Sequence, residues 1–434
     1  MSTQTAAIVT NGHGEAQTNG HAEVPQTLHA LRICMVHFSD FHVDSRLQRE
    51  TRALVDRGHE VDSLCLSESS VLEEGRGVIR LHNVPARRMH TGGVLAYFRG
   101  YGSFFARAMA MLNRLDRERC FDVVEIHNMP DFLSFAALPS RLRGVPVILN
   151  VHDTFPELFT TKFGARAARL FSPLMLAEER VSASWVDAVV TVTEEAGRRL
   201  ESRGVGRGKR HVVMNSPDET VFGPRREPVT IPAAGPVNVV YHGGTAPRFG
   251  VESLVRSIGL LKDSMPDLSL RVYGSFQEAP LAELAAEVAP DNVEVAPKPV
   301  PFRQIPEKLA ECHLGVVPTL RDEFTELLLP VKLMEYAHMG LPVVASRLPV
   351  VEHYFTDDEV LFYEPGSDDA LAAAIAESTL DPERARDRAV RASRKLEDLD
   401  WATQRQNYVG LVERLAGLTP SQRRRLVAAP AASG

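Results

Sequence analysis

This sequence contains little cysteine, and it lacks both long apolar runs and a strong excess of charge of either sign. Its 434 residues include four widely separated cysteines without a CxxC pair, which disfavours a disulfide framework or a cysteine zinc site and indicates a reducing compartment. Cys34 and Cys65 lie in apparent strands and are expected to be buried thiols. The fifteen histidines show no HxxxH or HExxH spacing, so metal binding is disfavoured as well.

The formal net charge of −7 gives no basic field of the kind that binds nucleic acid, so no nucleic-acid partner is expected. No stretch approaches the roughly 20 apolar residues that a membrane span requires. Residues 1–30 lack the apolar and basic regions of a secretory signal, and their low hydrophobicity predicts a disordered leader. The tail 421–434 is predicted to be disordered too.

Strand-like runs alternate with helical patterns along the whole chain, which predicts an α/β fold of two doubly wound, Rossmann-like domains with parallel sheets. The stretch 219–236 is rich in proline, glycine and charge, as expected of a linker. It separates a first domain at 31–218 from a second at 237–395, with helices at 396–420 after them. Predicted strands lie near 32–38, 60–66, 78–84, 123–128, 145–151, 188–193 and 210–216, and in the second half at 237–244, 268–274, 293–298, 314–319, 342–346 and 361–365. Ligands of such sheets bind beyond the carboxyl ends of the strands.

The first strand of the second domain ends in a glycine-rich turn, "YHGGTAPRFG". Gly243 and Gly244 would let backbone approach a phosphate closely, and Arg248 supplies the only full positive charge of that loop. The plainer alternative is an ordinary strand-to-helix turn with a solvated arginine. The turn is not GxGxxG, which disfavours a dinucleotide site.

The segment "TELLLPVKLMEYAHMGLPVVAS" predicts a helix opened by Pro330 and ended by Gly340. Lys332 then lies in the first turn, where the helix dipole is already positive, so an anion is expected opposite it. Arg248 and Lys332 would flank a diphosphate, and Glu335, one turn deeper, would accept hydrogen bonds from hydroxyls. The alternative is an exposed Lys332–Glu335 pair worth a few tenths of a kcal/mol, which the apolar surroundings disfavour.

The pattern "LPVKLMEYAHMGLPVV" at 329–344 resembles the signature of the retaining glycosyltransferases of family four, which have the GT-B fold. Four more segments are similar to that family, and together they cover nearly the whole chain: 44–66, 125–138, 150–159 and the domain junction "NSPDETVF" at 215–222. The resemblance implies a nucleotide-sugar donor on the second domain, an acceptor on the first, and a last helix that crosses back to the first domain.

The resemblance also implies roles for single residues. The catalytic set is His152, Arg248, Lys332 and Glu335, with His152 beside the reacting sugar and Glu335 on the nucleotide ribose. The donor-binding set is Gly243, Gly244, Arg248, Leu329, Pro330, Lys332 and Glu335. The acceptor or cleft set is Asp44, Arg46, His127, Asn128 and Asp153. Two positions depart from the family: Leu327 replaces the first glutamate of the E-x7-E motif, with Glu326 one residue away, and Phe249 replaces a lysine common in relatives.

The expected activity is that of a hexosyltransferase (EC 2.4) using a UDP- or GDP-sugar and a lipid-linked or saccharide acceptor, in cell-surface polysaccharide or glycolipid assembly. Fixed cations and helix dipoles would stabilise the leaving diphosphate, and no DxD-like cluster occurs at the expected place, so neither a metal nor another cofactor is expected. Front-face attack would retain the anomeric configuration. The alternatives are another GT-B enzyme, such as a UDP-sugar 2-epimerase, and a non-catalytic nucleotide-sugar-binding protein.

A basic amphipathic stretch at 94–119 carries Arg99, Arg107 and Arg114, and Lys162, Arg166 and Arg169 form a second basic cluster. Such a helix either lies on anionic lipid or packs on the first sheet with solvated arginines. The first possibility would place a cytoplasmic protein at the inner membrane face.

Overall fold

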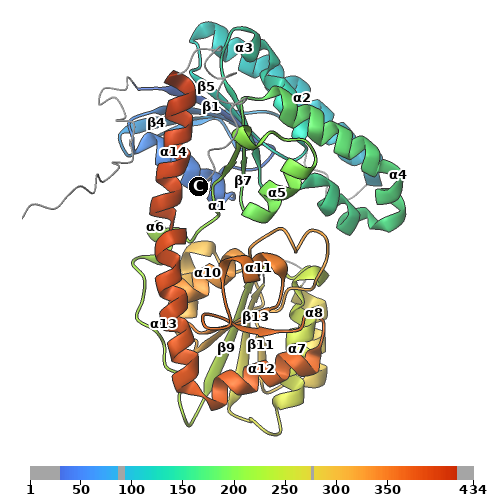
Figure 1. The fold of residues 1–434 in the computed structure, drawn as a ribbon, viewed down its shortest axis with the longest axis vertical. Coiled ribbons are helices and arrows are strands. Elements are labelled where there is room, and N and C mark those ends of the chain that lie inside the picture. Colours follow the sequence, from blue (N-terminus) through green and yellow to red (C-terminus); the bar gives the residue numbers. More distant parts are fainter. Residues whose placement is uncertain (1–29, 87–92, 275–277, 418–434) are drawn as a thin grey trace, which may run out of the picture.

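The computed structural model describes residues 30–86, 93–274 and 278–417, so the predicted leader and tail lie outside the described residues. The described chain forms two α/β halves, one above the other in Figure 1. Each half is a sheet with helices on both faces, and the α/β GT-B expectation is confirmed.

The first sheet has eight strands in the order β3-β4-β2-β1-β5-β6-β7-β8. Its strands are β1 Arg32–Val36, β2 Glu60–Cys65, β3 Ser70–Glu74, β4 Gly77–Asn83, β5 Val123–His127, β6 Val147–Val151, β7 Ala188–Thr191 and β8 Arg210–Val212. Neighbouring strands run parallel except β3, which pairs antiparallel with β4. The sequence pattern did not predict this edge strand, because β3 is polar and largely exposed.

The second sheet has six strands, all parallel, in the order β11-β10-β9-β12-β13-β14. Its strands are β9 Val237–Gly243, β10 Leu268–Gly274, β11 Val293–Val295, β12 Leu314–Val317, β13 Val343–Ser346 and β14 Leu361–Tyr363. The predicted linker contains a short helix, and its Arg226 and Val229 N–H groups donate to the carbonyls of His338 and Gly340, so this segment packs on the second domain.

The α-helices are α1 Ser45–Val55, α2 Gly93–Glu118, α3 Leu138–Leu142, α4 Phe155–Trp185, α5 Glu194–Ser202, α6 Glu219–Phe222, α7 Val251–Leu261, α8 Glu278–Val288, α9 Ile305–Leu309, α10 Val331–His338, α11 Pro349–Tyr354, α12 Asp368–Leu380, α13 Pro382–Leu399 and α14 Trp401–Gly417. Within the described ranges, none of them combines the length and apolarity needed to cross a membrane.

The central strands of the first sheet are buried along their whole length, as expected for parallel strands covered on both faces. One core lies between the sheet and α2 and α4, with Phe104, Leu112 and Phe159 among its members. The opposite core lies under α1 and α14, with Leu54 and Val412 among its members. The last helix therefore completes a face of the first domain although it follows the second domain in sequence (Figure 1).

Polar contacts fix the position of α14 on the first sheet. The Tyr408 hydroxyl donates to Glu125 Oε2 at 2.6 Å in the interior of β5. Glu413 Oε1 lies 3.2 Å from Arg57 Nε and 3.1 Å from His59 Nε2. Because both carboxylates are buried, these contacts satisfy charges that would otherwise be costly to remove from water.

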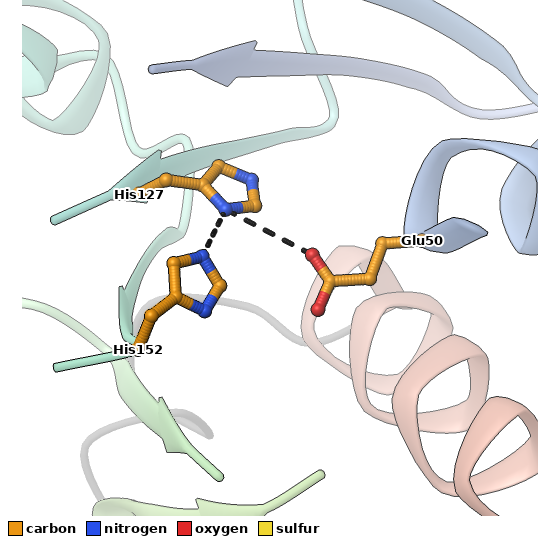
Figure 2. A group of neighbouring side chains, drawn as sticks. All are labelled: Glu50, His127 and His152. Atoms are coloured by element: carbon orange, nitrogen blue, oxygen red, sulfur yellow. Dashed lines mark hydrogen bonds and ion pairs between the residues drawn. The ribbon is translucent and has the colours of Figure 1, made fainter. Parts of the chain in front are cut away.

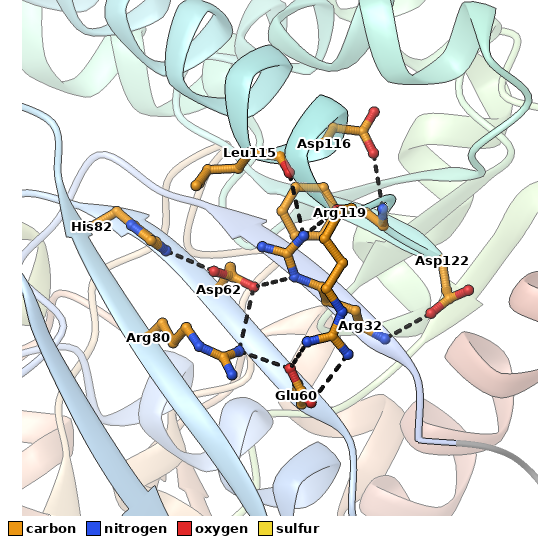
Figure 3. A network of polar contacts seen from close by, with 10 residues as sticks. Arg32, Glu60, Asp62, Arg80, His82, Leu115, Asp116, Arg119 and Asp122 are labelled. Atoms are coloured by element: carbon orange, nitrogen blue, oxygen red, sulfur yellow. Dashed lines mark hydrogen bonds and ion pairs between the residues drawn. The ribbon is translucent and has the colours of Figure 1, made fainter.

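A second charged network joins β1, β2, β4 and the end of α2 at the amino end of the first sheet (Figure 3). The fully buried carboxylate of Asp62 lies 2.8 Å from Arg32 Nε and 2.7 Å from His82 Nε2. Burial alone would raise the pKa of Asp62, but these two partners lower it overall. Glu60 binds Arg80 and Arg119 in the same network. The network closes the end of the sheet remote from the strand ends that carry the predicted site.

Tyr408→Phe should destabilise the first domain by roughly 1.5–3 kcal/mol, because the buried Glu125 carboxylate loses one of its hydrogen-bond donors. Urea unfolding followed by tryptophan fluorescence measures this change, since both tryptophans, Trp185 and Trp401, pack in the cores of the first domain. Asn407→Ala, an exposed substitution on the same helix, is the control and should change stability by less than about 0.5 kcal/mol. Equal midpoints for Tyr408→Phe and wild type would contradict the role given to this bond.

Candidate active site

The residues predicted for the site follow the carboxyl ends of strands in both sheets. Gly243 ends β9, and α10 follows β12 through the loop 318–330, while His127 ends β5 and His152 follows β6. The two domains contact each other near these strand ends. The Thr193 hydroxyl of the first domain donates to the Leu327 carbonyl of the second at 2.6 Å. The Glu194 N–H likewise donates to the Tyr354 hydroxyl at 2.8 Å.

A cavity of about 340 Å³ lies in the second domain between β9 and the start of α10. Six of the seven predicted donor-binding residues line it: Gly243, Gly244, Leu329, Pro330, Lys332 and Glu335. Phe249, Phe302 and Phe324 supply apolar walls. An apolar cavity with a few convergent polar groups is the usual form of a small-molecule site.

Lys332 is held at the cavity wall by aromatic groups. Its Nζ donates to the Tyr241 hydroxyl at 2.7 Å and lies 4.0 Å from the Tyr241 ring centroid and 5.1 Å from that of Phe249. The Tyr241 hydroxyl in turn donates to the Gly244 carbonyl. Burial lowers the pKa of Lys332 to about 7, and the opposing effect of Glu335 is smaller. The ammonium group therefore gains substantially from an anion placed in the cavity.

Gly243 is required by this arrangement. Its φ of 104° is in the left-handed region that favours glycine, and a Cβ there would lie 3.4 Å from Lys332 Nζ. Any other residue would thus strain the backbone, and its Cβ would be in van der Waals contact with the ammonium group. The glycine turn keeps the space in front of Lys332 open to a ligand.

Glu335 lies one turn further along α10 and is buried. His242 follows the apolar part of β9. The Glu335 Oε2 atom is 3.1 Å from His242 Nε2, but the two atoms do not have hydrogen-bond geometry. The helix itself begins at Val331, so Pro330 is its N-cap and not its first residue. Gly340 adopts a φ of 75° just beyond the helix end, as the C-terminal signal predicted.

Arg248 is the predicted donor-binding residue that is absent from the cavity wall. Its guanidinium lies 5.1 Å from the ring centroid of Phe324, itself a wall residue. It also acts electrostatically on Asp153 of the first domain. Arg248 therefore lies at the rim of the cavity, against Phe324 and within electrostatic reach of the first domain.

The two departures from the family pattern have clear structural positions. Leu327 is buried at the domain contact, where its carbonyl accepts a hydrogen bond from the Thr193 hydroxyl. Glu326 lies 3.8 Å from Arg321 and lines a separate cavity with Arg198 and Arg199, so it does not replace the missing glutamate of the motif. The Phe249 ring lies against the Lys332 ammonium group. Among the described residues that line this cavity, Lys332 is the only lysine or arginine.

The histidines at the ends of β5 and β6 meet in the first domain (Figure 2). His127 Nδ1 lies 2.8 Å from His152 Nε2, and the two rings stack with centroids 5.1 Å apart. Asn128 fixes the loop after β6, since its Oδ1 accepts from the His152 N–H at 3.0 Å and its Nδ2 donates to the Asp153 carbonyl at 2.7 Å. The structure thus brings together the predicted residues His127, Asn128, His152 and Asp153.

The start of α1 adds the other two predicted cleft residues. Asp44 is the N-cap of α1 and accepts from the Leu47 N–H at 3.2 Å. Burial opposes its ionisation, but Arg46, the Leu47 N–H and nearby histidines lower the pKa of Asp44 overall. Burial raises the pKa of Asp153, against the influence of Arg46 and Arg248. Arg46 thus lies within electrostatic reach of both acids.

Burial keeps the histidines of this region uncharged at neutral pH. It lowers the pKa of His37 to about 3 and also lowers those of His127 and His152, the latter strongly. The same desolvation, with repulsion from Glu125, raises the pKa of Glu50 to about 8. The first-domain half of the site therefore presents neutral imidazoles, while the second-domain half presents a cation.

The sequence interpretation missed two carboxylates beneath the histidines. Glu50 of α1 has its Oε2 3.8 Å from His127 Nδ1, and Glu125 has its Oε1 3.9 Å from His127 Nε2. Asn150 Nδ2 donates to Glu125 Oε1 at 2.7 Å and reaches Glu50 Oε2 at 3.4 Å. A glutamate inside the otherwise apolar strand "VVEIH" was a usable signal, because an ionisable group in a buried strand needs a partner.

Comparison with known proteins agrees with this architecture. Residues 43–216 match the model of a glycosyl transferase 4-like domain, and residues 236–381 match that of the glycosyl transferases group 1. No sequence match to a curated protein was found.

Solved structures of similar fold include sucrose-phosphate synthase from Thermosynechococcus elongatus, with a TM-score of 0.69, 16% identity, and coverage of 89% of this chain and 99% of that one. The Anabaena HepE protein in complex with UDP has a TM-score of 0.63, 14% identity, and coverage of 89% and 100%. An E. coli trehalose-6-phosphate structure bound with UDP-2-fluoro glucose has a TM-score of 0.66, 14% identity, and coverage of 88% and 99%. Because the two matched models together span most of the chain and the fold agrees with both, the protein belongs to the group 1 glycosyltransferases of the GT-B type.

Proposed function

We propose that this glycosyltransferase moves a hexose from a UDP- or GDP-sugar to a hydroxyl acceptor with retention of configuration and without a metal. The observation that carries the proposal is Lys332, whose half-buried side chain faces a cavity bounded by a glycine turn and the start of α10. A UDP ligand in the HepE structure supports a nucleoside diphosphate as the occupant.

The leaving diphosphate would be stabilised by groups fixed before the reaction starts. Negative charge grows on its β-phosphate as the glycosidic bond breaks, and Lys332, the α10 N-terminus and the turn at Gly243 and Gly244 meet at one wall of the cavity. Arg248 at the rim would add a second cation when the domains close on the donor. Such preorganised charge can take the place of a divalent metal.

Transfer would proceed by attack on the face from which the diphosphate leaves. In that scheme the acceptor oxygen forms the new bond to the anomeric carbon, the bond to the diphosphate breaks, and the departing phosphate takes the acceptor's proton. His152 would orient the donor sugar from the first domain, and Asp44, Arg46, His127, Asn128 and Asp153 would shape the acceptor side. Glu335 would hold the ribose hydroxyls deeper in the cavity.

The acceptor is proposed to be a lipid-linked or saccharide alcohol of cell-surface polysaccharide or glycolipid assembly, reached at the inner face of an anionic membrane. Arg99, Arg107 and Arg114 are exposed on α2, with Arg114 weakly paired to Glu118. The side chains of Lys162, Arg166 and Arg169 lie outside the described residues.

An apolar stripe on the neighbouring α4 supports the membrane proposal. Leu170, Leu174 and Val181 are 74%, 65% and 54% exposed and lie on one face of the helix by their spacing. Phe105 of α2 and Trp185 of α4 contact rings of the same segment, 131–137, so both helices lie on one side of the first domain (Figure 1). Exposed leucines beside arginines are typical of a helix lying in the membrane interface.

A non-catalytic nucleotide-sugar-binding protein is the second candidate, favoured by one observation. Among the described residues that line the cavity, Glu335 is the only acid, since Leu327 is buried at the domain contact and Glu326 faces Arg321. Incubation with a panel of UDP- and GDP-sugars and acceptors distinguishes the two, since an enzyme releases nucleoside diphosphate and a binding protein does not.

Lys332→Ala should lower turnover roughly 10²-fold with the fold intact, as expected for loss of one group that stabilises a developing oxyanion.

Because the pKa of Lys332 in the free protein is about 7, the ammonium is present below pH 7 and is lost above it. Diphosphate binding should therefore take up a proton, and UDP or GDP affinity should fall between pH 7 and 9, by at most about tenfold per pH unit. Lys332→Arg keeps its charge and should flatten that slope. Calorimetry over this pH range makes the measurement, and an equal slope in both proteins would contradict the assignment.

Glu335→Gln should weaken nucleoside diphosphate binding roughly tenfold or more, because hydrogen bonds to a charged acceptor contribute about 1.5–3 kcal/mol. The 2′,3′-dideoxy nucleotide has no ribose hydroxyls to lose, so its affinity should change much less. Comparing the four dissociation constants isolates the ribose contact. Equal losses for both nucleotides would assign Glu335 to the helix or to the sugar.

Replacing Arg99, Arg107 and Arg114 with glutamine should reduce co-sedimentation with anionic vesicles at low salt and leave nucleotide affinity unchanged. The matched control replaces three exposed arginines of α13 in the second domain, Arg386, Arg391 and Arg394. If the wild-type protein does not bind such vesicles, or if both triple variants lose binding equally, the surface formed by α2 and α4 has no specific membrane role.

A further inference from the structure

Glu50, His127 and His152 form a group of metal-ligand side chains drawn from three separate elements, α1, β5 and the loop after β6. Each offers one ligand atom, and the three atoms lie within 4.8 Å of one another. Figure 2 shows them converging, with His127 Nδ1 facing both His152 Nε2 and the Glu50 carboxylate. They lie in the first domain, away from the cavity that contains Lys332.

We propose that Glu50, His127 and His152 form a binding site for a transition-metal cation of the Zn²⁺ type, and that the bound cation inhibits the enzyme. The inhibitory part rests on the proposed function, because it assumes that His152 serves the sugar-transfer reaction. The binding part rests only on the three side chains.

The two separations from His127 lie close to those of ligands on a single ion, and the third is within 4.8 Å. Ligand atoms each ~2.0–2.2 Å from a tetrahedral zinc lie roughly 3.3–3.6 Å from one another. The observed separations from His127 Nδ1, 2.8 Å to His152 Nε2 and 3.8 Å to Glu50 Oε2, lie on either side of that range. The two imidazoles must move apart slightly and the carboxylate must move closer, which ring and side-chain rotation can supply.

The donor set also suits zinc chemically. Two imidazoles and one carboxylate, with a fourth position free for water, are a ligand combination that zinc adopts in proteins. His152 is half-buried, whereas Glu50 and His127 are buried.

The surrounding charges are balanced and not strongly attractive to cations. The positive charges of Arg46 and Arg49, both on α1, act electrostatically on Glu50. The negative charges of Glu125 and Asp44 act on it with the opposite sign. Affinity must therefore come from the ligand bonds themselves. Mg²⁺ and Ca²⁺, which need several oxygen ligands, should bind poorly, whereas Zn²⁺ and Co²⁺ should bind.

A cation here would act as an inhibitor and not as a cofactor. Coordination through Nε2 would fix the His152 ring beside His127 and Glu50. The donor sugar would then lose the side chain proposed to orient it, while the diphosphate contacts of Lys332 would remain. Zinc should accordingly lower turnover and leave nucleoside diphosphate affinity almost unchanged.

The test starts from EDTA-treated, metal-free protein. Co²⁺ should give the visible absorption of a tetrahedral site with one equivalent bound, and Zn²⁺ should displace it in competition with a chromophoric chelator. Glu50→Gln and His127→Gln should each weaken Zn²⁺ binding at least tenfold. His42→Gln, an exposed histidine just before α1, is the control and should bind as wild type does. UDP or GDP affinity verifies that each variant is folded.

Turnover gives the second measurement. EDTA should leave activity intact, added Zn²⁺ should inhibit wild type and His42→Gln, and the same concentration of Mg²⁺ should not. In Glu50→Gln, whatever activity remains should resist zinc. Equal Zn²⁺ affinity in wild type and both ligand variants would overturn the metal site. Tight binding by wild type and weak binding by the variants, with no transfer from any donor, would keep the metal site and refute the proposed function instead.

Discussion

The return of α14 to the first sheet is the contact on which the rest of the molecule depends. This helix follows the second domain, yet its apolar side completes the core between α1 and the sheet. Its Tyr408 bonds to Glu125, which lies directly beneath the histidine pair. One helix therefore connects the orientation of the two domains to the floor of the candidate site.

Burial has different electrostatic consequences in the two halves of the site. In the second domain an ammonium group is buried against aromatic rings, which lowers its pKa and makes an anionic ligand favourable. In the first domain, burial lowers the pKa of the imidazoles, which are therefore neutral. It raises the pKa of Glu50, which retains its proton near neutral pH. An anion is attracted to the second-domain half, whereas the first-domain half can contact an uncharged group without a counter-ion.

The domain contact explains how a departure from the family pattern is accommodated. Leu327 occupies the position of a motif glutamate, but it is buried where the Thr193 hydroxyl binds its carbonyl. Arg49 of α1 holds the segment that leads to the second domain and the start of α14, since its guanidinium donates to the Ser216 carbonyl and lies 4.4 Å from the ring of Trp401. Side chains near the site therefore also hold the domains together, and substitutions there will change both properties.

The sequence by itself determined the two-sheet fold, most strand positions and the donor wall, because these depend on local apolar periodicity and on glycine and proline at strand and helix ends. Lys332 and Glu335 could be placed together since both lie on one helix. The edge strand β3 was missed because it is polar, and the rim position of Arg248 because it depends on the packing of Phe324. Only the tertiary structure brought Glu50, His127 and His152 together. They come from α1, β5 and the loop after β6, and no spacing rule within one segment can reveal ligands that meet only when parallel strands align their carboxyl ends.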